Sequence, residues 1–136
     1  MCFLKVFSEI DSFKKFKEET NLPVYSCYDK GEKSKKRTFK DYWISFDVSN
    51  KEWDNFNGQV EDAILFLKKY KNEIGELLNR YSILDAYLDF PIYSRLDDNI
   101  VNQNDHLPRE LVTLAGELHI GIEMAIYSRN AFDECT

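Results

Sequence analysis

Apolar and polar residues alternate between Ser82 and Tyr93, where the sequence is SILDAYLDFPIY. Successive side chains of an extended strand point to opposite faces, so this alternation separates two sets of residues. The apolar set, which can enter a core, consists of Leu84, Ala86, Leu88, Phe90 and Ile92. The other set carries two carboxylates and a phenol and consists of Asp85, Tyr87 and Asp89. The pattern predicts a sheet with one buried face and one polar, aromatic face. Pro91 lacks an amide hydrogen, so the last residues suit an edge or a bulge.

Four further segments have the composition of strands, and two of them alternate clearly. Their ranges are Phe3–Phe7, Val24–Asp29, Phe39–Val48 and Ile120–Tyr127. In the third, the apolar side is formed by Tyr42, Ile44, Phe46 and Val48, and the other side by Trp43, Ser45 and Asp47. In the fourth, Ile120, Ile122, Met124 and Ile126 share one side, and the other holds His119, Gly121, Glu123, Ala125 and Tyr127.

Helical spacing of apolar residues occupies the intervals between these strands. Asp11 or Ser12 can cap a short helix that buries Phe13 and Phe16 and ends at Asn21–Pro23. A longer apolar stripe contains Val60, Ile64, Leu67, Ile74, Leu78 and Tyr81. It fits one helix or two helices that meet near residues 71–72. A last helix begins at Pro108, with Leu111, Leu114, Ala115 and Leu118 on its inner side.

The predicted order is β-α-β-β-α-β-α-β in a single domain spanning residues 1–136. Alternating strands mixed with helices indicate an α+β fold, with a mostly antiparallel sheet of about five strands and helices on one face. A ferredoxin-like arrangement or an elaboration of it is the architecture that we expect. A basic loop at 30–37, a polar loop at 94–106 and a loose tail at 128–136 complete the chain.

The net charge of −6 is unevenly distributed. Residues 1–40 hold ten Lys and Arg against six Asp and Glu, whereas residues 41–136 hold eight against eighteen. An acidic body repels nucleic acid and attracts basic partners, although most such charge serves solubility alone. The basic loop 30–37 has no aromatic residues between its cations, so we interpret it as a solvated connection rather than a phosphate site. It could also fold back onto the acidic body.

The three cysteines do not form a disulfide or zinc pattern, since their number is odd and no CxxC spacing occurs. We also find no signal-peptide pattern and no apolar run long enough to span a bilayer. We therefore expect a cytoplasmic protein that has no membrane partner.

No catalytic motif is present, so we predict a protein that is not an enzyme and needs no cofactor. The five glycines are scattered and form no nucleotide-binding loop, and G-x-S-x-G is absent. The polar loop 94–106 offers oxygen ligands but lacks the calcium-binding spacing, so no metal site is predicted. Asp85 and Asp89 would stand roughly 13 Å apart along one strand at about 3.3 Å per residue, too far for a glycosidase pair.

What remains is the polar, aromatic face of the sheet. We expect it to carry the binding residues Trp43, Asp47, Asp85, Tyr87, Asp89, Glu123 and Tyr127, together with Phe3 and Phe7. Aromatic side chains supply rigid contact area, and carboxylates orient a basic protein partner. A small-molecule or glycan site that uses Trp43, Tyr87 and Tyr127 for stacking is the alternative, and a self-associating domain that forms a homodimer is a third. These side chains could also serve only to stabilise the sheet.

Several landmarks spread over residues 3–128 resemble a bacterial family of domains of unknown function, the one numbered 4279. They are the turn at Asn21–Pro23, KGE at Lys30–Glu32, Trp43 in its strand, LPREL at Leu107–Leu111 and the final IGIEMAIYS. The segment NLPVYSCYDKGE departs from that family's glycine- and proline-rich pattern. The resemblance implies no enzymatic activity. It suggests a role like that of similar small acidic domains in toxin–immunity loci, namely an immunity protein whose partner is a basic toxin domain.

Overall fold

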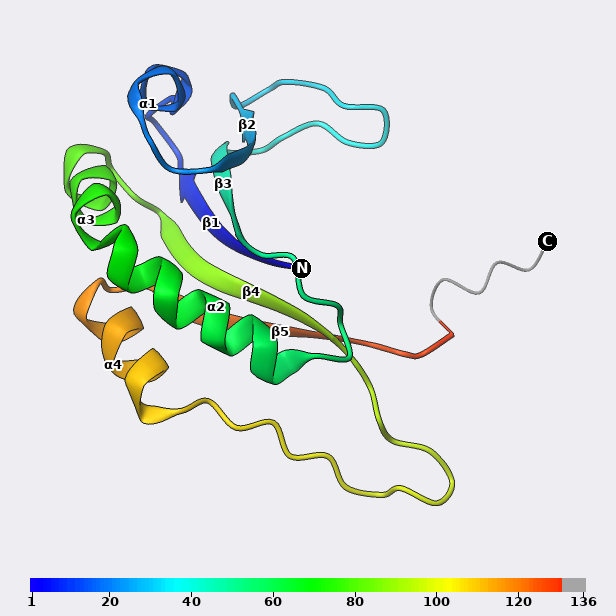
Figure 1. Ribbon diagram of the computed structural model, residues 1–136. Helices are drawn as coiled ribbons and strands as arrows, with labels where there is room; N and C mark the ends of the chain where they lie inside the picture. Colours follow the sequence, from blue (N-terminus) through cyan, green and yellow to red (C-terminus); the bar gives the residue numbers. More distant parts are fainter. Residues whose placement is uncertain (131–136) are drawn as a thin grey trace.

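A computed structural model of the chain describes residues 1–130, which form five strands and four helices (Figure 1). The strands are β1 (Cys2–Ser8), β2 (Val24–Tyr28), β3 (Tyr42–Ser49), β4 (Asp85–Tyr93) and β5 (Gly121–Tyr127). The helices are α1 (Lys14–Glu19), α2 (Phe56–Lys69), α3 (Lys71–Arg80) and α4 (Arg109–Glu117).

The five strands form one sheet in the order β2-β3-β1-β4-β5. Neighbours are antiparallel except β4 and β5, which are parallel. The parallel pair follows from the chain between them, because a parallel connection requires a crossover and α4 supplies it. The predicted α+β class with a mostly antiparallel sheet is therefore confirmed. The ferredoxin-like arrangement stays a prediction.

The two faces of the sheet differ as the alternation predicts. Ala86, Leu88, Phe90 and Ile92 are buried beneath the helices, and Asp85 and Tyr87 lie on the opposite face. Leu84 is an exception, because its side chain is 52% exposed. The expectation that Leu84 enters the core is wrong: β4 begins at Asp85, and alternation assigns faces only within the extended strand.

The helices cover one face of the sheet (Figure 1). The long apolar stripe is divided at Tyr70 between α2 and α3, which confirms the two-helix alternative. At the start of α2, the Asn55 side chain accepts a hydrogen bond from the amide of Gly58 and so caps the helix. The largest side chains that are fully buried in this layer include Phe13, Phe46, Phe90, Leu67, Leu77 and Leu111.

Pro91 and Phe39 are two further positions to compare with the predicted strands. β4 pairs with β1 only as far as Asp89, so Pro91 lies where no β1 carbonyl needs a hydrogen bond from it. Phe39 does not begin β3 as expected. It lies three residues earlier in a hairpin closed by backbone hydrogen bonds to Gly31 and Glu32, and Gly31 provides the positive φ of 90° that the turn requires. The predicted loose tail, 128–136, lies outside the described residues from 131 onward.

Candidate functional site

The open face of the sheet carries its side chains in rows that run across the strands. One row contains Asp47, Phe3, Asp89 and Glu123, each directly opposite its neighbour on the next strand. The next row contains Ser45, Lys5, Tyr87 and Gly121, and a third contains Trp43, Phe7 and Asp85. Tyr127 lies farther along, opposite Tyr93. The structure therefore brings all seven predicted binding residues onto one face, while their role in binding stays a prediction.

The sequence led us to expect an exposed carboxylate at Asp89, and this expectation is wrong. The residue is only 8% exposed, and its Oδ2 lies 2.7 Å from the Nζ of Lys5. Lys5 is diagonal to Asp89 on the neighbouring strand, which places its ammonium within reach. The other oxygen, Oδ1, is buried and has no hydrogen-bond partner among the described residues.

The remaining acidic side chains of this face are exposed. They belong to Asp47, Asp85 and Glu123. Together with the Lys5–Asp89 pair, the strand side chains of this face include four carboxylates and one ammonium, a net charge of −3. Tyr87 responds to this field: burial raises the pKa of its phenol, and the carboxylates of Glu123, Asp89 and Asp85 raise it further. The negative charge therefore converges on the middle of the face.

Aromatic side chains flank the carboxylates at the β2–β3 end. Phe7 lies 5.2 Å from Trp43, and Phe39 stacks on Tyr28 at 4.0 Å between ring centroids. The guanidinium of Arg37 lies 4.5 Å from the Phe39 ring centroid and 4.9 Å from that of Trp43. Arg37, the last residue of the basic loop, thus lies over rings of the sheet face, and it is exposed like the lysines before it.

A second aromatic group forms around Trp53, which the sequence analysis missed. Its ring stacks on Tyr127 at 4.8 Å and lies 5.3 Å from Tyr93. Trp53 lies between β3 and α2, where the surrounding residues are polar and predict only a connection. The one available signal was a large aromatic residue inside an otherwise polar segment.

Between the two aromatic groups the face is hollowed, with a volume of about 230 Å³. Its polar lining residues include Lys5, Asp89 and Ser45, and its aromatic lining residues include Trp43, Trp53 and Tyr127. The indole Nε1 of Trp43 is buried and, like Asp89 Oδ1, has no hydrogen-bond partner among the described residues. The hollow thus combines stacking surfaces with one unsatisfied donor and one unsatisfied acceptor in its lining residues.

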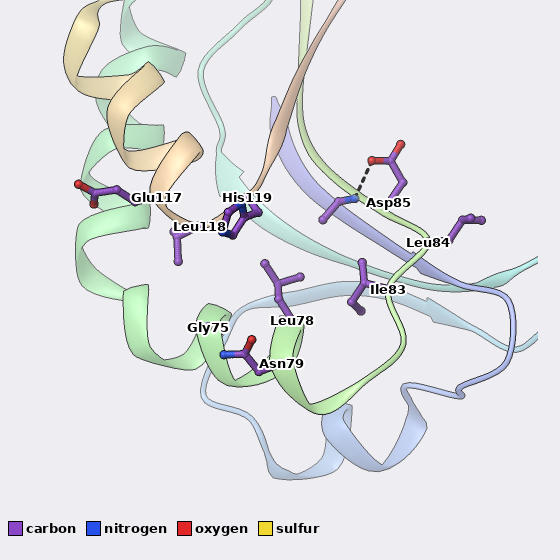
Figure 2. A pocket seen from close by; sticks show the side chains of 10 residues that line it. Gly75, Leu78, Asn79, Ile83, Leu84, Asp85, Glu117, Leu118 and His119 are labelled. Atoms are coloured by element: carbon purple, nitrogen blue, oxygen red, sulfur yellow. Dashed lines mark hydrogen bonds between the residues drawn. The ribbon is translucent and has the colours of Figure 1, made fainter.

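A second cavity, of about 360 Å³, lies at the start of β4 and β5 (Figure 2). Its lining includes His119, Asp85 and Glu117, three groups that could exchange protons if they lay close together. Figure 2 shows Glu117 pointing away from His119, and the Asp85 carboxylate is turned back to accept a hydrogen bond from the amide of Ala86. His119 follows Leu118, the C-cap of α4, and has the φ of 57° that is common just past a helix end, where its amide donates to the carbonyl of Gly116. The cavity does not assemble a proton-transfer pair.

The polar loop is organised by its own side chains. Arg95 donates to Asp105 at 2.9 Å, and Gln103 bonds to both the Arg95 amide and Asp105. Over residues 1–130, no group of three or more His, Cys, Asp or Glu side chains is placed to hold a metal ion. Within the same range, none of the helices has the length and apolar character needed to cross a membrane.

No protein-family model, curated protein or solved structure matches this chain. The resemblance to the family numbered 4279 therefore stays a prediction, and the geometry of the open face carries the functional argument.

Proposed function

We propose that this chain is a non-enzymatic binding protein whose open sheet face engages a basic protein. The observation that carries the proposal is the row of three carboxylates at Asp47, Asp89 and Glu123, with Asp85 nearby and a net charge of −3 on the strand side chains of the face. Acidic side chains of this kind accelerate the encounter with a basic partner and select its orientation. The aromatic groups at both ends supply rigid area that can anchor the partner.

The specific form that we propose is an immunity protein that neutralises a cationic toxin domain, such as a nuclease. Two properties support this form. The acidic face resembles a nucleic acid in its charge, which suits a protein that blocks a basic substrate-binding surface. The carboxylates of Asp47, Asp85 and Glu123 are exposed, and Arg37 at the end of the basic loop lies over the rings of Phe39 and Trp43.

Charge reversal at exposed carboxylates tests this proposal. The test variant combines Asp47→Lys, Asp85→Lys and Glu123→Lys. Asp89 is left unchanged, because its replacement would also disrupt a buried ion pair. The matched control reverses three exposed carboxylates on the helices, namely Glu18→Lys, Glu61→Lys and Glu76→Lys, and changes the net charge by the same amount.

The assay measures the affinity for the protein encoded immediately upstream by titration calorimetry at two salt concentrations. We expect the face variant to lose about a hundredfold or more in affinity, as charged interface contacts do, while the control variant retains wild-type affinity. Wild-type binding should weaken as salt rises, since exposed charges are screened. Equal losses in both variants would show a general charge effect and would contradict a contact through this face.

A second candidate function is the binding of a small planar molecule or a glycan in the hollow. The unsatisfied Asp89 Oδ1 and Trp43 Nε1, in residues that line a space with aromatic walls, favour this candidate specifically. A thermal-shift screen with oligosaccharides and small aromatic compounds tests it, because a ligand that binds the native state raises its stability. A compound that stabilises the wild type but not Trp43→Ala would favour this function over a protein partner.

A further inference from the structure

The outer edge of β5 is a candidate pairing surface. β5 is the last strand of the sheet, and β4 is its only strand neighbour within residues 1–130. Alternate residues of this seven-residue strand therefore present backbone N–H and C=O groups on the side away from β4. Such an edge is a template for pairing with another strand unless charges, proline or a bulge block it. β5 has none of these except Glu123, whose side chain points to the open face.

The opposite edge of the sheet is protected by contrast. β2 has five residues, and its pairing with β3 shifts register between Val24 and Ser26. Pro23 precedes the strand and the lysine-bearing hairpin follows it. A short, irregular strand between a proline and a charged hairpin is poorly suited to add a partner. Of the two edges, β5 is the one that residues 1–130 leave open to pairing.

The sequence of β5, GIEMAIY, is self-complementary when two copies pair antiparallel about Met124. In this register Met124 faces Met124 of a second copy, Ile122 faces Ile126, Glu123 faces Ala125, and Gly121 faces Tyr127. No like charges are opposed, apolar side chains face apolar side chains, and an aromatic ring covers a glycine. The two-fold axis is perpendicular to the sheet, so the helices of both copies remain on the same side.

The neighbouring registers are less favourable. Pairing about Glu123 would place two carboxylates directly opposite each other, which destabilises a strand pair. Pairing about Ala125 would leave Gly121 and Ile122 without a position to face and would shorten the ladder from seven positions to five. The composition of β5 therefore selects one register.

The apolar side of β5 gives a further reason for self-pairing. Ile126 is 59% exposed, and Val112, on the helix α4 that crosses over to β5, is 50% exposed. Ile126 belongs to β5 itself, and α4 precedes this strand in the chain. In a symmetric pair, Ile126 is covered by Ile122 of the second copy. By symmetry, the Ile126 side chain of each copy is removed from water.

We propose that two copies of this chain pair through β5, antiparallel about Met124, to form one continuous ten-stranded sheet. The two open faces then lie side by side on one surface, each with its carboxylates and aromatic groups. A seven-residue strand is roughly 23 Å long at about 3.3 Å per residue. An interface built on one such strand falls in the small class, under about 1,200 Å², so the dimer dissociates on dilution. The inference stands independently of what the open face binds.

Cysteine cross-linking tests both the pairing and its register. In a Cys135→Ser background, Met124→Cys places two thiols directly opposite each other, with Cβ atoms about 4.5–5.5 Å apart, close to the roughly 3.5–4.5 Å that a disulfide needs. The matched control is Ile126→Cys. It is the more exposed position, but the proposed register places it opposite residue 122, so the two introduced thiols lie far apart. Cys2 and Cys27 are buried and contribute little background.

We expect a mild oxidant to convert Met124→Cys to a disulfide-linked dimer at least tenfold faster than Ile126→Cys. Sedimentation velocity of the wild type, over about a hundredfold range of concentration, should show a monomer that becomes a dimer as concentration rises, by mass action. Faster cross-linking of Ile126→Cys would overturn the register. A wild-type protein that stays monomeric throughout, with equally slow cross-linking of both variants, would overturn the pairing itself.

Discussion

Replacing Lys5 with methionine removes the ammonium that lies 2.7 Å from Asp89 Oδ2 and leaves the carboxylate buried. At that distance the attraction between two unit charges is about 6 kcal/mol for an effective dielectric constant of about 20. Desolvation of both groups opposes this attraction. Breaking a buried pair by removing one partner costs about 3–5 kcal/mol. The side chain of Lys5 is 22% exposed and that of Asp89 12% exposed, so the lower end of this range applies, about 3 kcal/mol.

The two single variants should differ in severity. Lys5→Met leaves a charge that is almost completely buried, whereas Asp89→Asn leaves an ammonium that can still reach water. We therefore expect Asp89→Asn to cost about half as much as Lys5→Met. The double variant Lys5→Met/Asp89→Asn should be more stable than Lys5→Met alone, with a coupling energy of about 2–3 kcal/mol between the two sites.

Urea unfolding followed by tryptophan fluorescence measures these free energies of unfolding. Trp43 is a suitable reporter, because its ring centroid lies 5.7 Å from the Lys5 Nζ. For a chain of this length, a loss of 3 kcal/mol lowers Tm by about 10 °C. The control Lys15→Met removes an exposed lysine of α1 and should change stability by less than about 0.5 kcal/mol. If Lys5→Met changes the free energy of unfolding by less than about 0.5 kcal/mol, or if the effects of the two single variants simply add, the ion pair does not stabilise the fold.

Two further predictions concern titration. The Tyr87 phenol should titrate above its ordinary pKa, and Glu123→Gln should move that pKa back toward about 10, since a nearby negative charge disfavours the phenolate. NMR titration of the tyrosine Cζ resonances measures this pKa. An unchanged pKa in Glu123→Gln would show that Glu123 does not act on Tyr87. Burial raises the pKa of the Cys2 thiol, so the unfolded chain loses this proton at lower pH than the folded chain does. Stability should therefore be unaffected by this group below about pH 8.5 and should fall above it, by up to about 1.4 kcal/mol per pH unit. Cys2→Ala should flatten this part of the stability curve, and an equally steep fall in that variant would assign the effect to other groups.

Much of the fold follows from local pattern. The division of β4 into a buried and an open side is a consequence of covalent geometry, because consecutive side chains of any extended segment point to opposite faces. The same geometry placed Trp43, Asp47, Glu123 and Tyr127 on the open face once their strands were assigned. The break between α2 and α3 was also visible, as an interruption of the apolar stripe near Lys71.

The prediction failed at residues that fit the apolar pattern of a strand but lie outside the extended backbone of that strand. Leu84 continues the alternation of β4 but precedes the strand, so its side chain is not bound by the pleat. Phe39 is an apolar residue next to a strand, and it is buried by stacking on Tyr28 rather than by joining β3. In both cases the apolar character of the residue was recognised, but the backbone conformation that decides where its side chain points was not.

Contacts between segments distant in the chain required the folded molecule. The pairing of Lys5 with Asp89 depends on the register between β1 and β4, which are separated by about eighty residues, and no local pattern encodes it. The positions of Trp53 over Tyr127 and of Arg37 over Trp43 arise in the same way. One-dimensional patterns specify which face of an element is apolar, because that depends on bond geometry alone. Which charges neutralise each other, and which edge is left open, depend on how the elements pack.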